Sequence, residues 1–385
     1  MITRAVSVFV LAALAAACGD DPSTSPPVDA PLAPSSVEAP GPYPVGTTTV
    51  TLTDAARDRS LRVEIWYPAT EAARATAAAG APIKKFVPAG PERDQLAALV
   101  AAAPDPGTSR RSHAARDAEA ATGGPWAVVA FSHCYNCTRY STFAVAERLA
   151  SHGIAVVAPD HAGGTLPDQL AGTAQPIGVP FLETRAADIR FVLDRVLDAQ
   201  AAELPATLRG RFDAARVGVF GHSFGGVTTG LVLMNDARPK AGLAIAVPME
   251  NPLLPAVSLA QIHVPLLFFL ATEDHSIGPI GNTILRQNFT NANPPVTLVE
   301  VADAGHWSFS NICGLIPDFA AGCAAAPTRE GDGTPFEYVD IDAARGLTQA
   351  YVTAFFKATL MQDAEADAFV DGPARAAFAT VQTRR

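Results

Sequence analysis

One serine of this sequence stands in a setting that suits a nucleophile. Ser223 is the centre of Gly221-His222-Ser223-Phe224-Gly225, which joins the apolar run 217–220 to a helical stretch ending near 234. A serine at a sharp strand-to-helix turn exposes its hydroxyl, and any side chain two positions away would collide with the turn. The N–H of Phe224 then starts a helix and can face a developing oxyanion. The pattern predicts acyl transfer with Ser223 as nucleophile rather than an ordinary glycine-rich turn.

A serine nucleophile needs a base, and the base needs a carboxylate to orient it. Where the serine lies at such a turn, the chain order is serine, acid, histidine, each just past the end of a strand. Run 266–271 leads to Asp274, and run 296–301 leads to His306, so we predict these as acid and base. Glu273 and Asp303 are the weaker alternatives, because Asp303 is close enough to His306 to bond its own turn instead. The other histidines precede the serine, adjoin it or the acid, or lie outside such loops.

The second oxyanion donor should come from the loop after strand 126–131, which reads Ser132-His133-Cys134-Tyr135-Asn136-Cys137. A metal site built from His133, Cys134, Cys137 and His161 would need a second ligand pair at finger-like spacing, which does not follow. A redox Cys-x-x-Cys would need a thioredoxin-like context, which is also missing. We therefore expect a structural role, in which a small bridge or buried thiols brace the turn.

Continuously apolar runs alternate with amphipathic stretches and predict an α/β fold with a mostly parallel, doubly covered sheet. The strands are expected at 126–131, 154–159, around 217–220, 243–247, 266–271 and 296–301, and the helices at 140–152, 183–198, 224–234 and 343–356. Runs 47–53 and 61–67 predict an N-terminal antiparallel hairpin. Residues 69–124 are rich in Ala, Pro, Gly and charge. We interpret them as a low-order insertion with one helix at 93–102, rather than as a lid.

The N-terminus is typical of an exported chain. Residues 1–17 have a basic start and a short apolar core, and predict a signal peptide with Cys18 as the lipidated residue; ordinary secretory cleavage after Ala17 is the alternative. Residues 18–44 are predicted to be a disordered tether and 363–385 a C-terminal tail, which leaves 45–362 as the hydrolase domain. Of the five cysteines, lipidation of Cys18 leaves four for two disulfides. Local pairing is the simplest of three connectivities, and the four candidates are Cys134, Cys137, Cys313 and Cys323.

The length and net charge of the chain further limit the classes of function and partner that are expected. The chain of 385 residues has room for one large α/β domain with tails, and 49% hydrophobic residues suit a packed enzyme. A net charge of −10 without a long basic run argues against a nucleic-acid partner. We expect a monomer, with the membrane as a partner only through acylated Cys18.

Several segments together resemble the bacterial dienelactone-hydrolase-like esterases, which are related to the type II platelet-activating-factor acetylhydrolases. They are 41–46, 65–68, 131–133, 149–153, 158–161 and the Ser223 motif. The resemblance implies an α/β-hydrolase fold, a triad of Ser223, Asp274 and His306, no cofactor, and esterase activity on small or lipid-like esters. By motif matching it assigns the second oxyanion N–H to Tyr135. Segment 273–277 also resembles the acid loop of polyester hydrolases, where the aspartate is catalytic.

The chain departs from this family at Cys134, where glycine is usual, so a φ above zero there would be strained. A serine in place of the cysteine nucleophile means that the dienelactone substrate itself is not implied. The function predicted is a serine hydrolase acting on small, lipid-like or polymeric carboxylic esters. A catalytically silent binding module of the cell envelope and an acyltransferase are the rival hypotheses.

Overall fold

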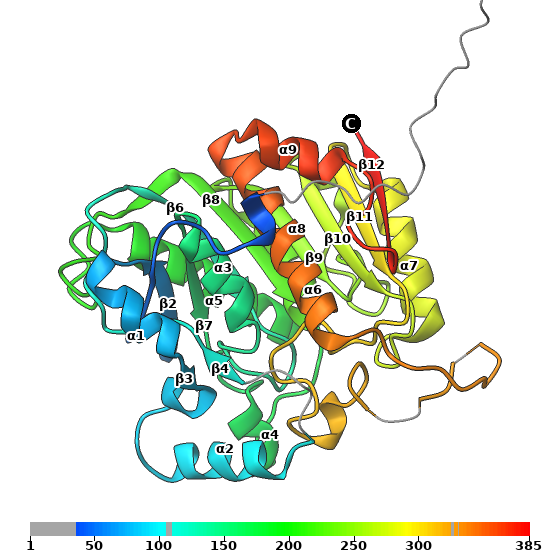
Figure 1. The fold of residues 1–385 in the computed structure, drawn as a ribbon, viewed down its shortest axis with the longest axis horizontal. Coiled ribbons are helices and arrows are strands. Elements are labelled where there is room, and N and C mark those ends of the chain that lie inside the picture. Colours follow the sequence, from blue (N-terminus) through cyan, green and yellow to red (C-terminus); the bar gives the residue numbers. More distant parts are fainter. Residues whose placement is uncertain (1–35, 105–109, 325–326, 330) are drawn as a thin grey trace, which may run out of the picture. The chain divides into compact units, whose positions relative to one another are not determined.

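The computed structural model describes residues 36–104, 110–324, 327–329 and 331–385. The predicted signal peptide and lipidated Cys18 lie outside these residues. The main feature is a sheet in the order β12-β11-β10-β9-β8-β6-β7-β2-β1-β5. Figure 1 labels its strands except β1 and β5. Its strands are β1 (Val45–Asp54), β2 (Arg59–Pro68), β5 (Ala115–Arg116), β6 (Trp126–Ser132), β7 (Ile154–Pro159), β8 (Phe212–His222), β9 (Pro239–Ile245), β10 (Leu266–Ala271), β11 (Val296–Val301) and β12 (Ala379–Arg384).

The centre of the sheet is parallel and buried on both faces. Strands β7, β6, β8, β9, β10 and β11 pair in parallel, and every residue of β6, β7 and β10 is buried. Continuously apolar strands are what a sheet covered on both sides requires. The predicted hairpin is confirmed, because β1 pairs with β2 in antiparallel register from Val45↔Pro68 to Asp54↔Arg59. The carboxyl ends of β6, β8, β10 and β11 lead into the loops that carry the predicted site residues.

Two groups of helices cover the sheet. Core residues of α3, α8 and α9 share one apolar cluster, and those of α5, α6 and α7 share the other. The helices are α1 (Arg74–Ala79), α2 (Pro91–Ala102), α3 (Phe143–Ser151), α4 (Leu166–Ala171), α5 (Val179–Leu197), α6 (Phe224–Asn235), α7 (Gly278–Asn291), α8 (Ile341–Met361) and α9 (Ala364–Asp371). None of the helices in the described part of the chain has the length and hydropathy of a bilayer span.

The C-terminal residues correct the prediction of a tail. Residues 363–385 form α9 and β12, and β12 pairs antiparallel with β11 at the sheet edge. Phe369 and Val370 of α9 are buried in the core. An edge strand with one covered face needs few apolar residues, so Ala379–Arg384 gives only a weak sequence signal. The folded domain therefore extends beyond residue 362.

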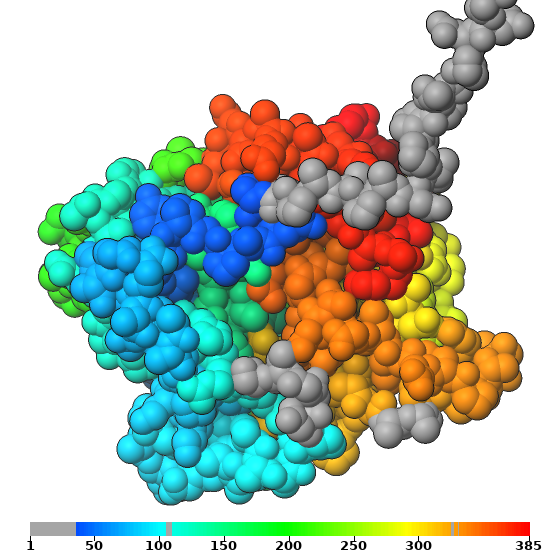
Figure 2. Space-filling view, in the orientation of Figure 1, coloured from blue at the N-terminus to red at the C-terminus, as the bar shows by residue number. Residues whose placement is uncertain are grey.

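Two further segments are more ordered than expected. Residues 36–44, assigned to the tether, begin with a 3₁₀ turn at Ser36–Glu38 whose Val37 is buried, and in Figure 2 this blue segment lies against the orange and red C-terminal helices.

In the described part of 69–124, α2 confirms the predicted helix. The short strands β3 (Ala81–Pro82) and β4 (Arg111–Ser112) pair with each other, and β5 joins the main sheet beside β1. Ile83, Phe86 and Leu96 are buried, so tertiary contacts order a segment of low apolar content.

Candidate active site

The turn between β8 and α6 has the geometry predicted for a nucleophile. Ser223 has φ 53° and ψ −128°, a backbone conformation that non-glycine residues rarely adopt. A Cβ on Gly221 would overlap the carbonyl of Gly225, and a Cβ on Gly225 would overlap that of Ser132. The spacing of the two glycines around the serine is therefore a steric requirement of this turn and of its contact with the end of β6.

Of the three acids considered from the sequence, Asp274 contacts the predicted base. His306 Nδ1 lies 2.9 and 2.8 Å from the two carboxylate oxygens of Asp274, and both side chains are buried. Glu273 and Asp303 instead pair with Arg329, at 2.5 and 2.7 Å. An imidazole that donates from Nδ1 to a carboxylate keeps Nε2 as an acceptor, which is the state that a general base requires.

Asp274 is itself held by its loop. Its Oδ1 accepts the backbone N–H groups of Ser276 and Ile277 at 2.9 and 3.1 Å, in the turn that leads from β10 into α7. These bonds fix the carboxylate with its oxygens toward His306. A carboxylate held in this way keeps a neutral imidazole in one tautomer and stabilises its protonated form.

His222 links the serine turn to the histidine loop, and the sequence did not predict this role. Its ring lies 4.9 Å from that of His306, centroid to centroid, and its Nε2–H donates to the backbone carbonyl of His306 at 2.9 Å. Burial, reinforced by the charge that His306 can carry, lowers the pKa of His222 well below its usual range, so it is neutral. The residue adjoining Ser223 therefore fixes the backbone of His306. Adjacency in sequence to the serine was the one available signal.

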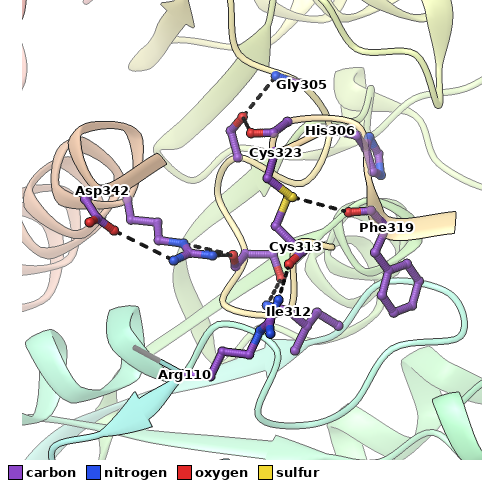
Figure 3. Close-up of a disulfide and its surroundings, with 12 residues drawn as sticks. Arg110, Gly305, His306, Ile312, Cys313, Phe319, Cys323 and Asp342 are labelled. Atoms are coloured by element: carbon purple, nitrogen blue, oxygen red, sulfur yellow. Dashed lines mark hydrogen bonds and ion pairs between the residues drawn. A yellow bond between two sulfur atoms is a disulfide. The ribbon is translucent and has the colours of Figure 1, made fainter. Parts of the chain in front are cut away.

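A disulfide loop packs against the histidine segment, as Figure 3 shows. Cys313 and Cys323 are bridged, and the backbone N–H of Trp307 donates to Ala321 O inside the loop at 2.8 Å. A Cβ on Gly305 would overlap the backbone of residues 321–322, so glycine is needed for this close approach. The loop thus holds the residues on both sides of His306.

The loop after β6 is closed by the second disulfide, Cys134–Cys137. The structure thus contains the local pairings, the simplest of the three connectivities, and a bridged pair offers no thiolate to a metal. The residue with positive φ is Asn136, at 58°, and not Cys134, so the departure from glycine causes no strain there. No backbone hydrogen bond within the described residues takes the N–H of Tyr135 or Phe224. Their aromatic rings meet edge to face at 6.2 Å.

Comparison with known proteins places this geometry in a family. Residues 118–316 match the family model described as PET hydrolase-like, and residues 35–165 match platelet-activating factor acetylhydrolase, isoform II. The first match covers more than half of the chain. The chain belongs to the PET hydrolase-like family. The predicted resemblance to α/β-hydrolase serine esterases is confirmed, with the acetylhydrolase relation appearing in the N-terminal part.

Two cutinases and one solved esterase are similar to this PET hydrolase-like chain. Cutinases est1 and est2 of Thermobifida alba are 30% and 31% identical over 48% of the chain. The chain spans about half of their length, 54% and 53%. The structure of a ferulic acid esterase from Streptomyces cinnamoneus superposes with a TM-score of 0.62 at 26% identity, covering 85% of this chain and 93% of that one. The predicted α/β-hydrolase fold is confirmed.

A cavity of about 590 Å³ in this PET hydrolase-like chain lies apart from these residues. It opens between the segment 40–45, α1, α3 and α8, and its walls include Tyr43, Phe143, Glu147 and Arg148. Ser223, Asp274 and His306 do not line it. The candidate site therefore lies at the carboxyl ends of the strands and is separate from this cavity.

Proposed function

We propose that this protein hydrolyses carboxylic esters through an acyl-enzyme formed on Ser223. His306 Nε2 takes the hydroxyl proton as Ser223 attacks the ester carbonyl, and Asp274 stabilises the imidazolium that results. The C–O bond to the alcohol breaks as His306 returns the proton to the leaving oxygen. Water then attacks the acyl-enzyme with His306 again as base, which releases the acid and restores Ser223. The proposed oxyanion donors are the N–H groups of Phe224 and Tyr135.

The observation that carries this proposal is the buried His306–Asp274 pair, linked through His222 to a serine in a strained turn. A strained backbone at a polar, partly accessible residue needs a reason, and the display of a nucleophile supplies one. A silent binding module would gain nothing from this strain or from a buried, aligned carboxylate and imidazole. The relatives named as cutinases and a ferulic acid esterase point in the same direction.

The proposal is tested with p-nitrophenyl esters of increasing acyl length. We expect the wild type to hydrolyse them and to be labelled by a fluorophosphonate at Ser223. Ser223→Ala should lose about 10⁶-fold in kcat and all labelling, with an unchanged melting temperature. Ser60→Ala, an exposed serine of β2, is the matched control and should behave as the wild type.

Three results would lead to different conclusions. A folded wild type that neither reacts with the label nor cleaves any ester would favour a binding module. Product formed on an added alcohol in preference to water would indicate an acyltransferase. Full activity in Ser223→Ala would refute the nucleophile assignment. The acyl length at which kcat/KM peaks would separate small, lipid-like and polyester substrates.

We also propose that the chain is exported and acts as a monomer, anchored to the cell envelope when Cys18 is acylated. The two disulfides support export, because such bonds persist in oxidising compartments. Radiolabelled palmitate should be incorporated into the wild type and not into Cys18→Ser, and an unlabelled wild type would refute the anchor. Sedimentation velocity of the purified protein tests the monomer.

A further inference from the structure

A second serine–histidine–aspartate array lies directly behind the loop that follows β6. Ser132 Oγ is 3.0 Å from His161 Nε2, and His161 Nδ1 is 3.1 Å from Asp188 Oδ2. The order of groups is that of a nucleophile, a base and an acid, but all three side chains are fully buried. No ester can reach Ser132 in this position, so the array cannot act on substrate. Its effect must pass through the residues that it holds.

Charge and hydrogen bonding fix one protonation state for this array. Burial, reinforced by the nearby Arg185, lowers the pKa of His161 to about 4, so the ring is neutral at pH 7. Asp188 also accepts hydrogen bonds from Arg57 and Arg59 at 2.7–2.8 Å and stays ionised. His161 therefore donates from Nδ1 to Asp188 and accepts the Ser132 hydroxyl at Nε2.

The ordered backbone at His161 fixes the tautomer of a second buried histidine, His133. The N–H of His161 donates to His133 Nε2 at 3.0 Å, so the His133 proton must lie on Nδ1. Burial lowers the pKa of His133 well below its usual range, which keeps the ring neutral. From Nδ1 it donates to the carbonyl of Cys134 at 2.6 Å. A neutral ring in one tautomer satisfies both bonds.

The carbonyl of Cys134 and the N–H of Tyr135 belong to one planar peptide unit, so fixing the oxygen also fixes the direction of the N–H. The preceding peptide is held as well, because Arg185 donates to the carbonyl of His133 and, at 3.2 Å, to Ser132 Oγ. The Arg185 guanidinium also lies 4.8 Å from the centre of the Phe224 ring. The buried groups thus hold the peptide unit that carries the Tyr135 N–H and contact the ring of Phe224, the two residues whose N–H groups we assign to the oxyanion hole.

We propose that His133 is a positioning residue. It clamps the Cys134–Tyr135 peptide so that the Tyr135 N–H faces the oxyanion. The backbone N–H of His161 keeps it in the required tautomer, and the bonds of the His161 ring to Ser132 and Asp188 hold that residue in place. This inference rests on the proposed ester hydrolysis. A donor aligned before the reaction stabilises the oxyanion without reorganisation in the transition state. A hydrogen bond to the carbonyl also polarises the same peptide and strengthens its N–H as a donor.

Two substitutions of His133 separate its two hydrogen bonds. In His133→Asn the amide nitrogen takes the place of Nδ1, which keeps the donor to Cys134 and loses the acceptor for the His161 N–H. In His133→Gln the longer amide reaches the place of Nε2, which keeps the acceptor and loses the donor. We expect His133→Gln to lower kcat about 100-fold with KM little changed, and His133→Asn to keep most of kcat. The inhibition constant of an arylboronic acid, which forms a tetrahedral adduct, should rise for Gln in parallel with the loss of kcat/KM.

The outcomes distinguish this inference from the proposed function. Equal losses of kcat that follow the melting temperatures of both variants would mean that His133 only stabilises the fold and would overturn the inference. So would wild-type kcat in His133→Gln. A wild type inactive on every ester would refute the proposed function instead. Should the variants fail to fold, ¹⁵N NMR of the wild type decides: the inference requires an Nδ1–H tautomer at His133 between pH 6 and 8, and an Nε2–H tautomer would overturn it.

Discussion

Removing the bridge between Cys313 and Cys323 should weaken both stability and catalysis. The two cysteines are separated by 10 residues, and the chain-entropy relation gives about 2.7 kcal/mol at 25 °C for closing a loop of this length. In a domain of this size that corresponds to a melting temperature lower by roughly 4 °C. The variant Cys313→Ala/Cys323→Ala, measured by calorimetry, tests this magnitude.

The loss of activity follows from where the loop packs. Gly305 and Trp307 both contact residues 321–322, so a loosened loop frees the backbone on either side of His306. A displacement of the imidazole by about 1 Å can cost about 100-fold in kcat. We therefore expect kcat on a p-nitrophenyl ester to fall clearly, at a temperature well below the unfolding transition.

The other disulfide provides the matched control. Cys134 and Cys137 are separated by 3 residues, and the same relation gives only about 1.6 kcal/mol. Cys134→Ala/Cys137→Ala should therefore lose less stability. Strong reductant should lower the melting temperature of the wild type by about the sum of the decreases that the two variants show. Unchanged kcat in the Cys313→Ala/Cys323→Ala variant would refute the argument that this loop positions His306. An unchanged melting temperature would refute the loop-closure argument.

Three further changes test other parts of the structure. Asp274→Asn should lower kcat about 10⁴-fold by favouring the wrong tautomer of His306, while Asp303→Asn should not; equal losses would contradict the acid assignment. Burial raises the pKa of Glu147 from 4.5 to about 7. Between pH 4.5 and pH 7 the folded protein therefore keeps a proton that the unfolded chain loses. Over this range the free energy of unfolding should fall by at most about 3 kcal/mol as the pH rises. Urea unfolding of Glu147→Gln should show a smaller fall from pH 5 to pH 8, and parallel curves would contradict this. Gly225→Ala should prevent correct folding of the serine turn, whereas Gly346→Ala, in an open position of α8, should stabilise by about 0.5–1 kcal/mol; similar melting temperatures for both would be inconsistent with the steric argument.

The features that the sequence determined by itself are local. The strands β10 and β11 have the predicted bounds, and the turn at Ser223 has the predicted form. A strand buried on both faces must be continuously apolar, and a tight turn excludes side chains at fixed positions. Both requirements therefore produce a sequence pattern that can be recognised within a few residues. The chain order of the predicted triad can also be predicted from local signals, because each of its residues follows the end of a recognisable strand by a few positions.

Tertiary structure decided which polar groups meet. Glu273, Asp274 and Asp303 are similar in sequence context, and only the packing of β10 beside β11 directs one of them to His306 and the others to Arg329. The bond from His222 to the carbonyl of His306 spans 84 residues, and β12 reaches the sheet from the end of the chain. The identity of a polar side chain does not reveal its distant hydrogen-bonding partner. The reason is that the energy of a hydrogen bond depends on geometry that only the folded chain creates.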